Sequence, residues 1–217
     1  MTGAVRLATD PVRRAIGRRG MAGGLAALTA LAALALSLPP LRPLIEQSMV
    51  WHMLVQMPLL VLSGACAAAA WAPARELRWN RFGLTGFMLA QCIVAYWMIP
   101  ALVDRAVVLP SADAGKLASL WLAGAALRLG YRQAPVAVQL FFIGYGVPMM
   151  AWLGLYLAST DLRLCNAYSL QSQLRTGWGL VALAAALGVA WALDLRFGSG
   201  LPRAGAERDQ ALYPAGR

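Results

Sequence analysis

The sequence predicts an all-α fold: a polytopic transmembrane bundle of about six helices with both termini on the cytoplasmic side. Hydrophobic residues make up 60% of the 217 residues, and the mean hydropathy is +0.61. Only 13% of the residues are charged, against about 25% in a typical soluble domain. Leu, Ala, Val and Trp form long runs, which a bilayer accepts because a helix satisfies its own backbone hydrogen bonds.

The positions of the basic residues predict the orientation of these helices. Of the 19 Lys and Arg residues, 14 fall in segments expected on the cytoplasmic side and 5 in outer segments, as the positive-inside rule requires. The net charge of +10 suggests a nucleic-acid partner. We reject that partner, because the arginines lie in short loops between spans. The partner that the composition does indicate is the lipid bilayer.

Taken in order, the chain divides into a basic cytoplasmic N-terminus (1–20), a helical bundle (21–193) and a flexible cytoplasmic tail (194–217). Within the bundle the expected spans are 21–38, 47–72, 83–103, 117–131, 134–158 and 175–193. The first run has two interpretations, a retained span or the core of a cleaved signal peptide, because Ala33-Leu34-Ala35 resembles a cleavage site. The segments Asp104 to Lys116 and 159–174 are expected to be outer loops.

Several classes of function are disfavoured by residues that the chain lacks. It has no GxSxG, HExxH or Gly-rich phosphate loop, so we expect no catalytic residues and no enzyme. A single histidine cannot supply a bis-histidine haem site. The expected spans carry no carboxylate near their middle, and Asp104, Asp161 and Asp194 fall at span ends, which argues against an ion-coupled transporter. Cys66, Cys92 and Cys165 show no CxxC spacing and predict no disulfide framework.

The stretch from Met49 to Gly64 combines an apolar span with the only histidine of the chain, His52. On an α-helix Met49, His52, Met53 and Gln56 follow the spacing i, i+3, i+4 and i+7, so they are expected to share one face. Thioether sulfur and imidazole together suit Cu(I) better than a hard ion. The alternative is that the methionines fill space between helices and that His52 hydrogen-bonds to a neighbour.

The expected topology places further soft ligands at the same depth. Met98 lies near the outer end of the third span, and Met149 and Met150 lie at or just outside the middle of the fifth. Methionines from three helices are therefore expected in the outer half of the membrane. The predicted copper ligands are His52, Met49, Met53, Met57 and Met98.

Three short segments resemble the CtaG-type family of cytochrome c oxidase assembly factors. They are His52-Met53-Leu54-Val55-Gln56-Met57-Pro58-Leu59-Leu60-Val61-Leu62, then Tyr96-Trp97-Met98-Ile99-Pro100-Ala101-Leu102-Val103-Asp104-Arg105-Ala106-Val107, and Ser172-Gln173-Leu174-Arg175-Thr176-Gly177. The resemblance implies an integral membrane protein linked to copper delivery to caa-type oxidases. Gln56 and Met98 stand where that family has further histidines. This difference implies either a methionine-based copper handler or a relative that has lost copper.

Three functions follow as hypotheses. The first is a bacterial inner-membrane assembly factor that binds Cu(I) and passes it to an oxidase subunit. The second is a copper-free accessory or scaffold subunit of a membrane oxidoreductase. The third, a small transporter, has the least support because the expected spans contain no buried charge.

Overall fold

The computed structural model describes residues 20–36, 38, 41, 48–71, 78–164 and 168–197, which form helices and short connections without a strand. The fold is therefore all-α over this part of the chain, as predicted. Residues 1–19 of the expected N-terminus and 198–217 of the expected tail lie outside the described residues. So do most of the loop after the first helix, residues 72–77 and Cys165.

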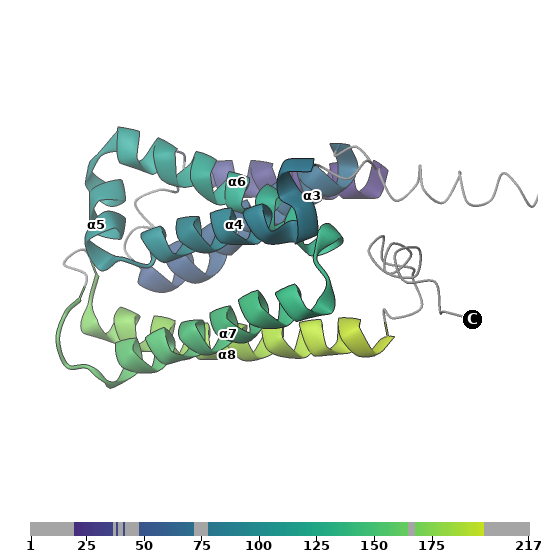
Figure 1. The fold of residues 1–217 in the computed structure, drawn as a ribbon. Helices are drawn as coiled ribbons and strands as arrows, with labels where there is room; N and C mark the ends of the chain where they lie inside the picture. Colours follow the sequence, from purple (N-terminus) through teal and green to yellow (C-terminus); the bar gives the residue numbers. More distant parts are fainter. Residues whose placement is uncertain are drawn as a thin grey trace, which may run out of the picture.

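Figure 1 shows how the helices are arranged. After the helix Gly20–Ala35 they are η1 (Trp51–Gln56), α3 (Met57–Trp71), η2 (Arg78–Gly83), α4 (Leu84–Trp97), α5 (Pro100–Val108), α6 (Pro110–Gln133), α7 (Val136–Ser159) and α8 (Leu170–Phe197).

Three helical stretches are long and apolar enough to cross a bilayer, namely Trp51–Ala70, Val136–Ser159 and Leu170–Arg196. A fourth span results if the bent pair Arg78–Trp97 and Ala101–Val108 is counted as one. The helix Gly20–Ala35 is apolar but shorter. The length and apolar composition of these helices indicate a membrane protein.

The helices form two layers (Figure 1). In one layer α3 and α4 both pack against α6, and in the other α7 runs antiparallel to α8. The helix Gly20–Ala35 lies against α3, where the Ser63 hydroxyl donates to the carbonyl of Ala26 at 3.1 Å. The short helix α5 lies across one end of the bundle, and this end carries the candidate site described below.

Two glycines set the distance between α3 and α6. A Cβ atom at Gly64 would collide with the carbonyl oxygen of Trp121, and one at Gly124 would collide with the carbonyl of Val61. The two backbones are therefore in direct contact. Close packing of this kind is how helices associate in membranes, where lipid is as apolar as the helix faces.

The third expected span, 83–103, is wrong as a continuous helix. Helix α4 ends at Trp97, and Ile99 is extended with φ −77° and ψ 117°. Helix α5 begins at Pro100, and the bend between the two axes is 76°. Proline disfavours the helical conformation in the residue before it, so the chain turns at Ile99 although the apolar pattern continues.

The expected outer loop from Asp104 to Lys116 is also wrong. Helix α5 continues to Val108, only Leu109 is extended, and α6 begins at Pro110. Lys116 therefore lies in the second turn of a 24-residue helix, with its side chain buried. This correction brings two charged residues, Asp113 and Lys116, into the interior.

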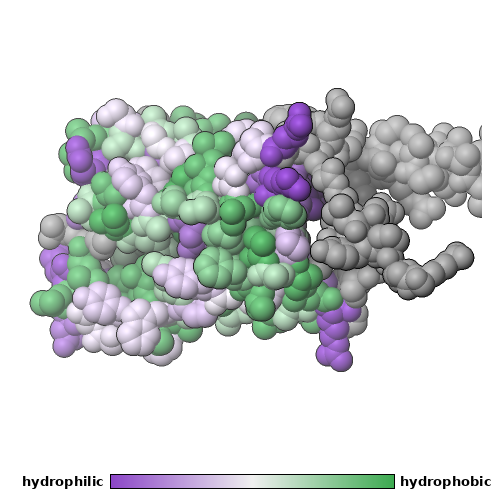
Figure 2. Space-filling model, viewed as in Figure 1, coloured by the Kyte–Doolittle hydropathy of each residue, from purple (hydrophilic) through white to green (hydrophobic). Residues whose placement is uncertain are grey.

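The surface agrees with a membrane environment. Figure 2 shows hydrophobic and near-neutral residues along the flank of the bundle and most hydrophilic residues near its two ends. On α7, Phe141, Tyr145 and Trp152 are 68%, 61% and 74% exposed. Large apolar surfaces of this kind on a soluble monomer would favour aggregation, whereas lipid covers them without cost.

We predict that Gly124→Ala destabilises the protein by about 1–3 kcal/mol, the usual effect of overpacking. Gly115→Ala on the same helix is the matched control, because a Cβ atom there meets nothing within 4 Å. The measurement is the free energy of unfolding of both variants in mixed micelles. Equal stabilities would show that α3 and α6 are not in backbone contact.

Candidate functional site

The site begins in η1, which is a π-helical turn in front of Pro58. The N–H of Met57 donates to the carbonyl of His52, an i to i+5 bond. Proline has no N–H and its ring crowds the carbonyl four residues earlier, and a widened turn relieves this crowding. π-Helical turns are rare and occur often at functional sites.

The predicted ligands around η1 do not all line one site. Met49 and Met53 line a common cavity, and His52 is not part of its lining. All three side chains are buried, at 1%, 1% and 8% exposed respectively. His52 contacts Lys116, whereas Met49 and Met53 line a cavity.

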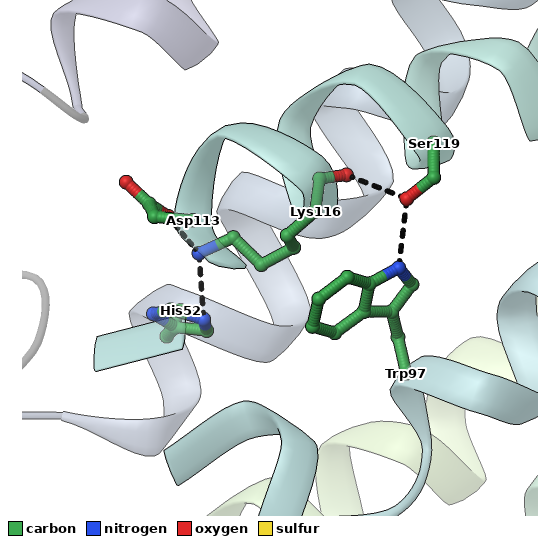
Figure 3. Close-up of polar contacts among 5 residues, drawn as sticks. All are labelled: His52, Trp97, Asp113, Lys116 and Ser119. Atoms are coloured by element: carbon green, nitrogen blue, oxygen red, sulfur yellow. Dashed lines mark hydrogen bonds and ion pairs between the residues drawn. The ribbon is translucent and has the colours of Figure 1, made fainter. Parts of the chain in front are cut away.

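His52 contacts a buried ion pair on α6 (Figure 3). The Lys116 ammonium lies 3.2 Å from Nε2 of His52 and 2.7 Å from a carboxylate oxygen of Asp113. Lys116 is only 1% exposed. Burial of an ammonium group is very costly without partners, so these contacts hold Lys116 in place.

The ion pair defines the state of the imidazole. An ammonium group has only donors, so Nε2 of His52 accepts the hydrogen bond from Lys116. A nitrogen that accepts this bond has no lone pair left for a metal ion. In this arrangement Nε2 of His52 therefore does not fit the role of a copper ligand.

Neighbouring side chains fix the geometry of this cluster. The Trp97 indole donates to the Ser119 hydroxyl at 2.8 Å, and Ser119 donates to the carbonyl of Lys116 at 3.2 Å (Figure 3). The ring of Tyr168, a 2% exposed residue, lies 6.3 Å from the His52 ring between centroids. The cluster thus joins η1, α4 and α6 beside the segment before α8.

Three of the predicted ligands line a cavity that is separate from the contacts of His52. A cavity of about 280 Å³ is lined by Met49, Met53 and Met98 together with Val103, Leu153, Tyr156, Leu157 and Leu164. Met49 and Met53 come from the start of the second span, and Met98 follows the end of α4 at the α4–α5 break. His52 and Met57 are not part of this lining, and Met149 and Met150 line a larger cleft.

Polar residues at the start of α8 hold the cavity wall. The Met49 N–H donates to the Ser172 hydroxyl at 2.9 Å, in a buried contact that joins the two layers. The Gln173 amide donates to the carbonyl of Leu162 at 3.0 Å and accepts from the N–H of Leu164 at 3.0 Å. Leu164 is thereby fixed against the thioethers.

Copper binding stays a prediction, and the structure brings three of its five predicted ligands to one cavity. Met49, Met53 and Met98 offer soft donors around one apolar space, which suits Cu(I). Within the described ranges, no group of three or more His, Cys, Asp or Glu side chains is placed to hold a metal ion. A metal at this site would thus depend on sulfur from methionine.

Sequence reasoning missed Asp113 and Lys116, because both were assigned to a loop. One signal was available: Lys116 is the only lysine among 19 basic residues. Its spacing from Asp113 is i to i+3, which places the two side chains on one face of a helix.

Comparison of this chain with protein-family models, with curated proteins and with solved structures finds no match. The function must therefore be argued from the site.

We predict that Lys116→Met destabilises the protein by about 3–5 kcal/mol, because it leaves the Asp113 carboxylate without its counter-charge. Adding Asp113→Asn should restore most of this loss, since the buried charge is then removed. Arg105→Met on α5 is the control, as Arg105 is exposed. Unfolding free energies of the single and double variants form a double-mutant cycle. Additive losses would contradict the pairing.

Proposed function

We propose that this protein is a bacterial inner-membrane Cu(I) carrier that serves the assembly of a cytochrome c oxidase, like the CtaG-type family that it resembles. The observation that carries the proposal is the cavity in which Met49, Met53 and Met98 meet. Their sulfur atoms are neutral and polarisable, so they can bind a soft monovalent cation without bringing further charge into an apolar interior.

The proposed transfer needs weak binding and access from one side. Thioether ligands suit this role, because they remain neutral at every pH and release Cu(I) to a stronger thiolate or imidazole site. The cavity lies at the end of the bundle where α4, α5 and the start of η1 meet. In the proposed six-span arrangement with both termini in the cytoplasm, this end faces the periplasm.

His52 has a different role in this proposal from the one the sequence suggests. Its contact with Lys116 fixes η1 against α6, and η1 carries Met53 while Met49 lies just before it. His52 is then a positioning residue for the thioethers. No catalytic group is part of the proposal.

The second candidate is a copper-free accessory subunit of a membrane oxidoreductase. The observation in its favour is the exposure of α7. Only 6% of the most apolar stretch of this helix is buried within the chain. Phe141, Tyr145 and Trp152 on this helix offer a surface for another membrane subunit. Stable co-purification with such a complex in the absence of bound metal would favour this candidate.

We predict that the purified protein, loaded anaerobically with Cu(I), binds one equivalent, and that Met53→Leu with Met98→Leu lowers the affinity at least tenfold. Leucine keeps the volume and removes the sulfur, so the fold should tolerate the change. The measurement is competition with a chromophoric Cu(I) chelator, together with X-ray absorption of the bound copper, which should show sulfur neighbours.

Two variants serve as controls. Met88→Leu should leave binding unchanged, because Met88 lies on α4 and is 52% exposed. His52→Ala should still bind copper through sulfur neighbours, but more weakly, because the contact with Lys116 that positions η1 is lost. Copper that is lost only in His52→Ala would return the imidazole to the ligand set. The absence of specific copper binding in the native protein would reject the proposal.

A further inference from the structure

A large cleft separates the two helical layers. It has a volume of about 950 Å³, near the top of the range of about 300–1,000 Å³ that small-molecule sites occupy. Most of its lining is apolar and comes from both layers, including Phe87, Val94, Phe142, Val147, Met150 and Leu187. The layers that enclose it are those of Figure 1, with α4 and α6 on one side and α7 and α8 on the other.

The cleft is long and opens toward the flank of the bundle. Along α7 its lining extends from Phe142 to Tyr156, a distance of about 21 Å at 1.5 Å per residue. This exceeds half of the hydrocarbon core, which is about 30 Å thick. Trp152 and Tyr156 line the cleft and are 74% and 49% exposed, so a hydrocarbon chain can enter sideways from the bilayer.

One end of the cleft carries a positive charge. Arg128 lines the cleft, is half-buried, and makes no ion pair or hydrogen bond within the described ranges. Tyr131 and Trp191 line the same end, and the Tyr131 hydroxyl donates to the Asp194 carboxylate. The guanidinium group of arginine binds phosphate well, because it donates several charge-assisted hydrogen bonds in one plane.

The end of the cleft around Arg128 has an excess of positive charge, even when the negative charge of Asp194 is counted. The described charged residues of this end are Arg78, Arg81, Arg128, Arg132, Asp194 and Arg196. Asp194 keeps its negative charge while it accepts the hydrogen bond from Tyr131, but five arginines outnumber this one carboxylate. An anion that reaches this end therefore meets a favourable potential.

We infer that the cleft is a binding site for one anionic phospholipid. Its phosphate accepts hydrogen bonds from Arg128, and one acyl chain lies between the two layers along α4 and α7. The charge of Arg128 selects the anionic headgroup, and the length and apolar lining of the cleft select the chain. This inference is independent of copper.

The experiment is native mass spectrometry of the full chain, released from detergent micelles with added phosphatidylglycerol or phosphatidylcholine. We expect one retained phosphatidylglycerol on the native protein. In Arg128→Gln its apparent affinity should fall roughly tenfold, the effect of losing one charge-assisted hydrogen bond. Arg132→Gln, one turn further along α6 and exposed, should lower the affinity much less, because Arg132 does not line the cleft.

A second variant tests the chain-binding part of the cleft. Gly146 lines the cleft, and the nearest atom to a Cβ at this position is the Gln91 amide oxygen at 3.4 Å. Gly146→Phe should fill the space and abolish retention while Arg128 remains. Equal loss in Arg128→Gln and Arg132→Gln would overturn the inference. Equal retention of phosphatidylcholine and phosphatidylglycerol would also overturn it. So would displacement of the bound lipid by inorganic phosphate alone, or a co-purified protein bound in the cleft where the lipid is expected.

Discussion

The backbone contact between α3 and α6 is the constraint on which the rest of the structure depends. Gly64 and Gly124 allow the two helices to approach until their main chains touch. Lys116, near the start of the same helix α6, lies 3.2 Å from Nε2 of His52. Van der Waals packing therefore positions the electrostatic cluster, and the cluster in turn fixes the turn that carries the thioethers.

The residues around His52 look like a single site in the sequence, but they take part in two different sets of contacts. With α-helical spacing, the histidine and the methionines would share one face. In the structure, His52 contacts Lys116 while Met49 and Met53 line a cavity with Met98. The contact of His52 with Lys116 and the methionine-lined cavity are thus built from the same short stretch of chain, but they use different side chains.

Hydropathy was sufficient to predict an all-helical membrane protein and the approximate position of most helices. It failed where a local backbone rule opposed the apolar pattern, as at Ile99, which proline forces into an extended conformation although its neighbours are apolar. It also failed at Lys116, since only the tertiary partners of a lysine determine whether it lies in a loop or in the interior. The topology predicts that Met98 lies near Met49 and Met53, whereas the contact of His52 with Lys116 depends on the tertiary fold and cannot be predicted from the sequence.

Met98, at the break between α4 and α5, lines two different spaces. Together with Leu153 and Tyr156, it lines both the small sulfur-bearing cavity and the long cleft. These three side chains form a shared wall, so an occupant of one space that shifts them alters the other. If an occupant of one space shifts these side chains, thermodynamic linkage requires the occupant of the other to exert the same effect in return.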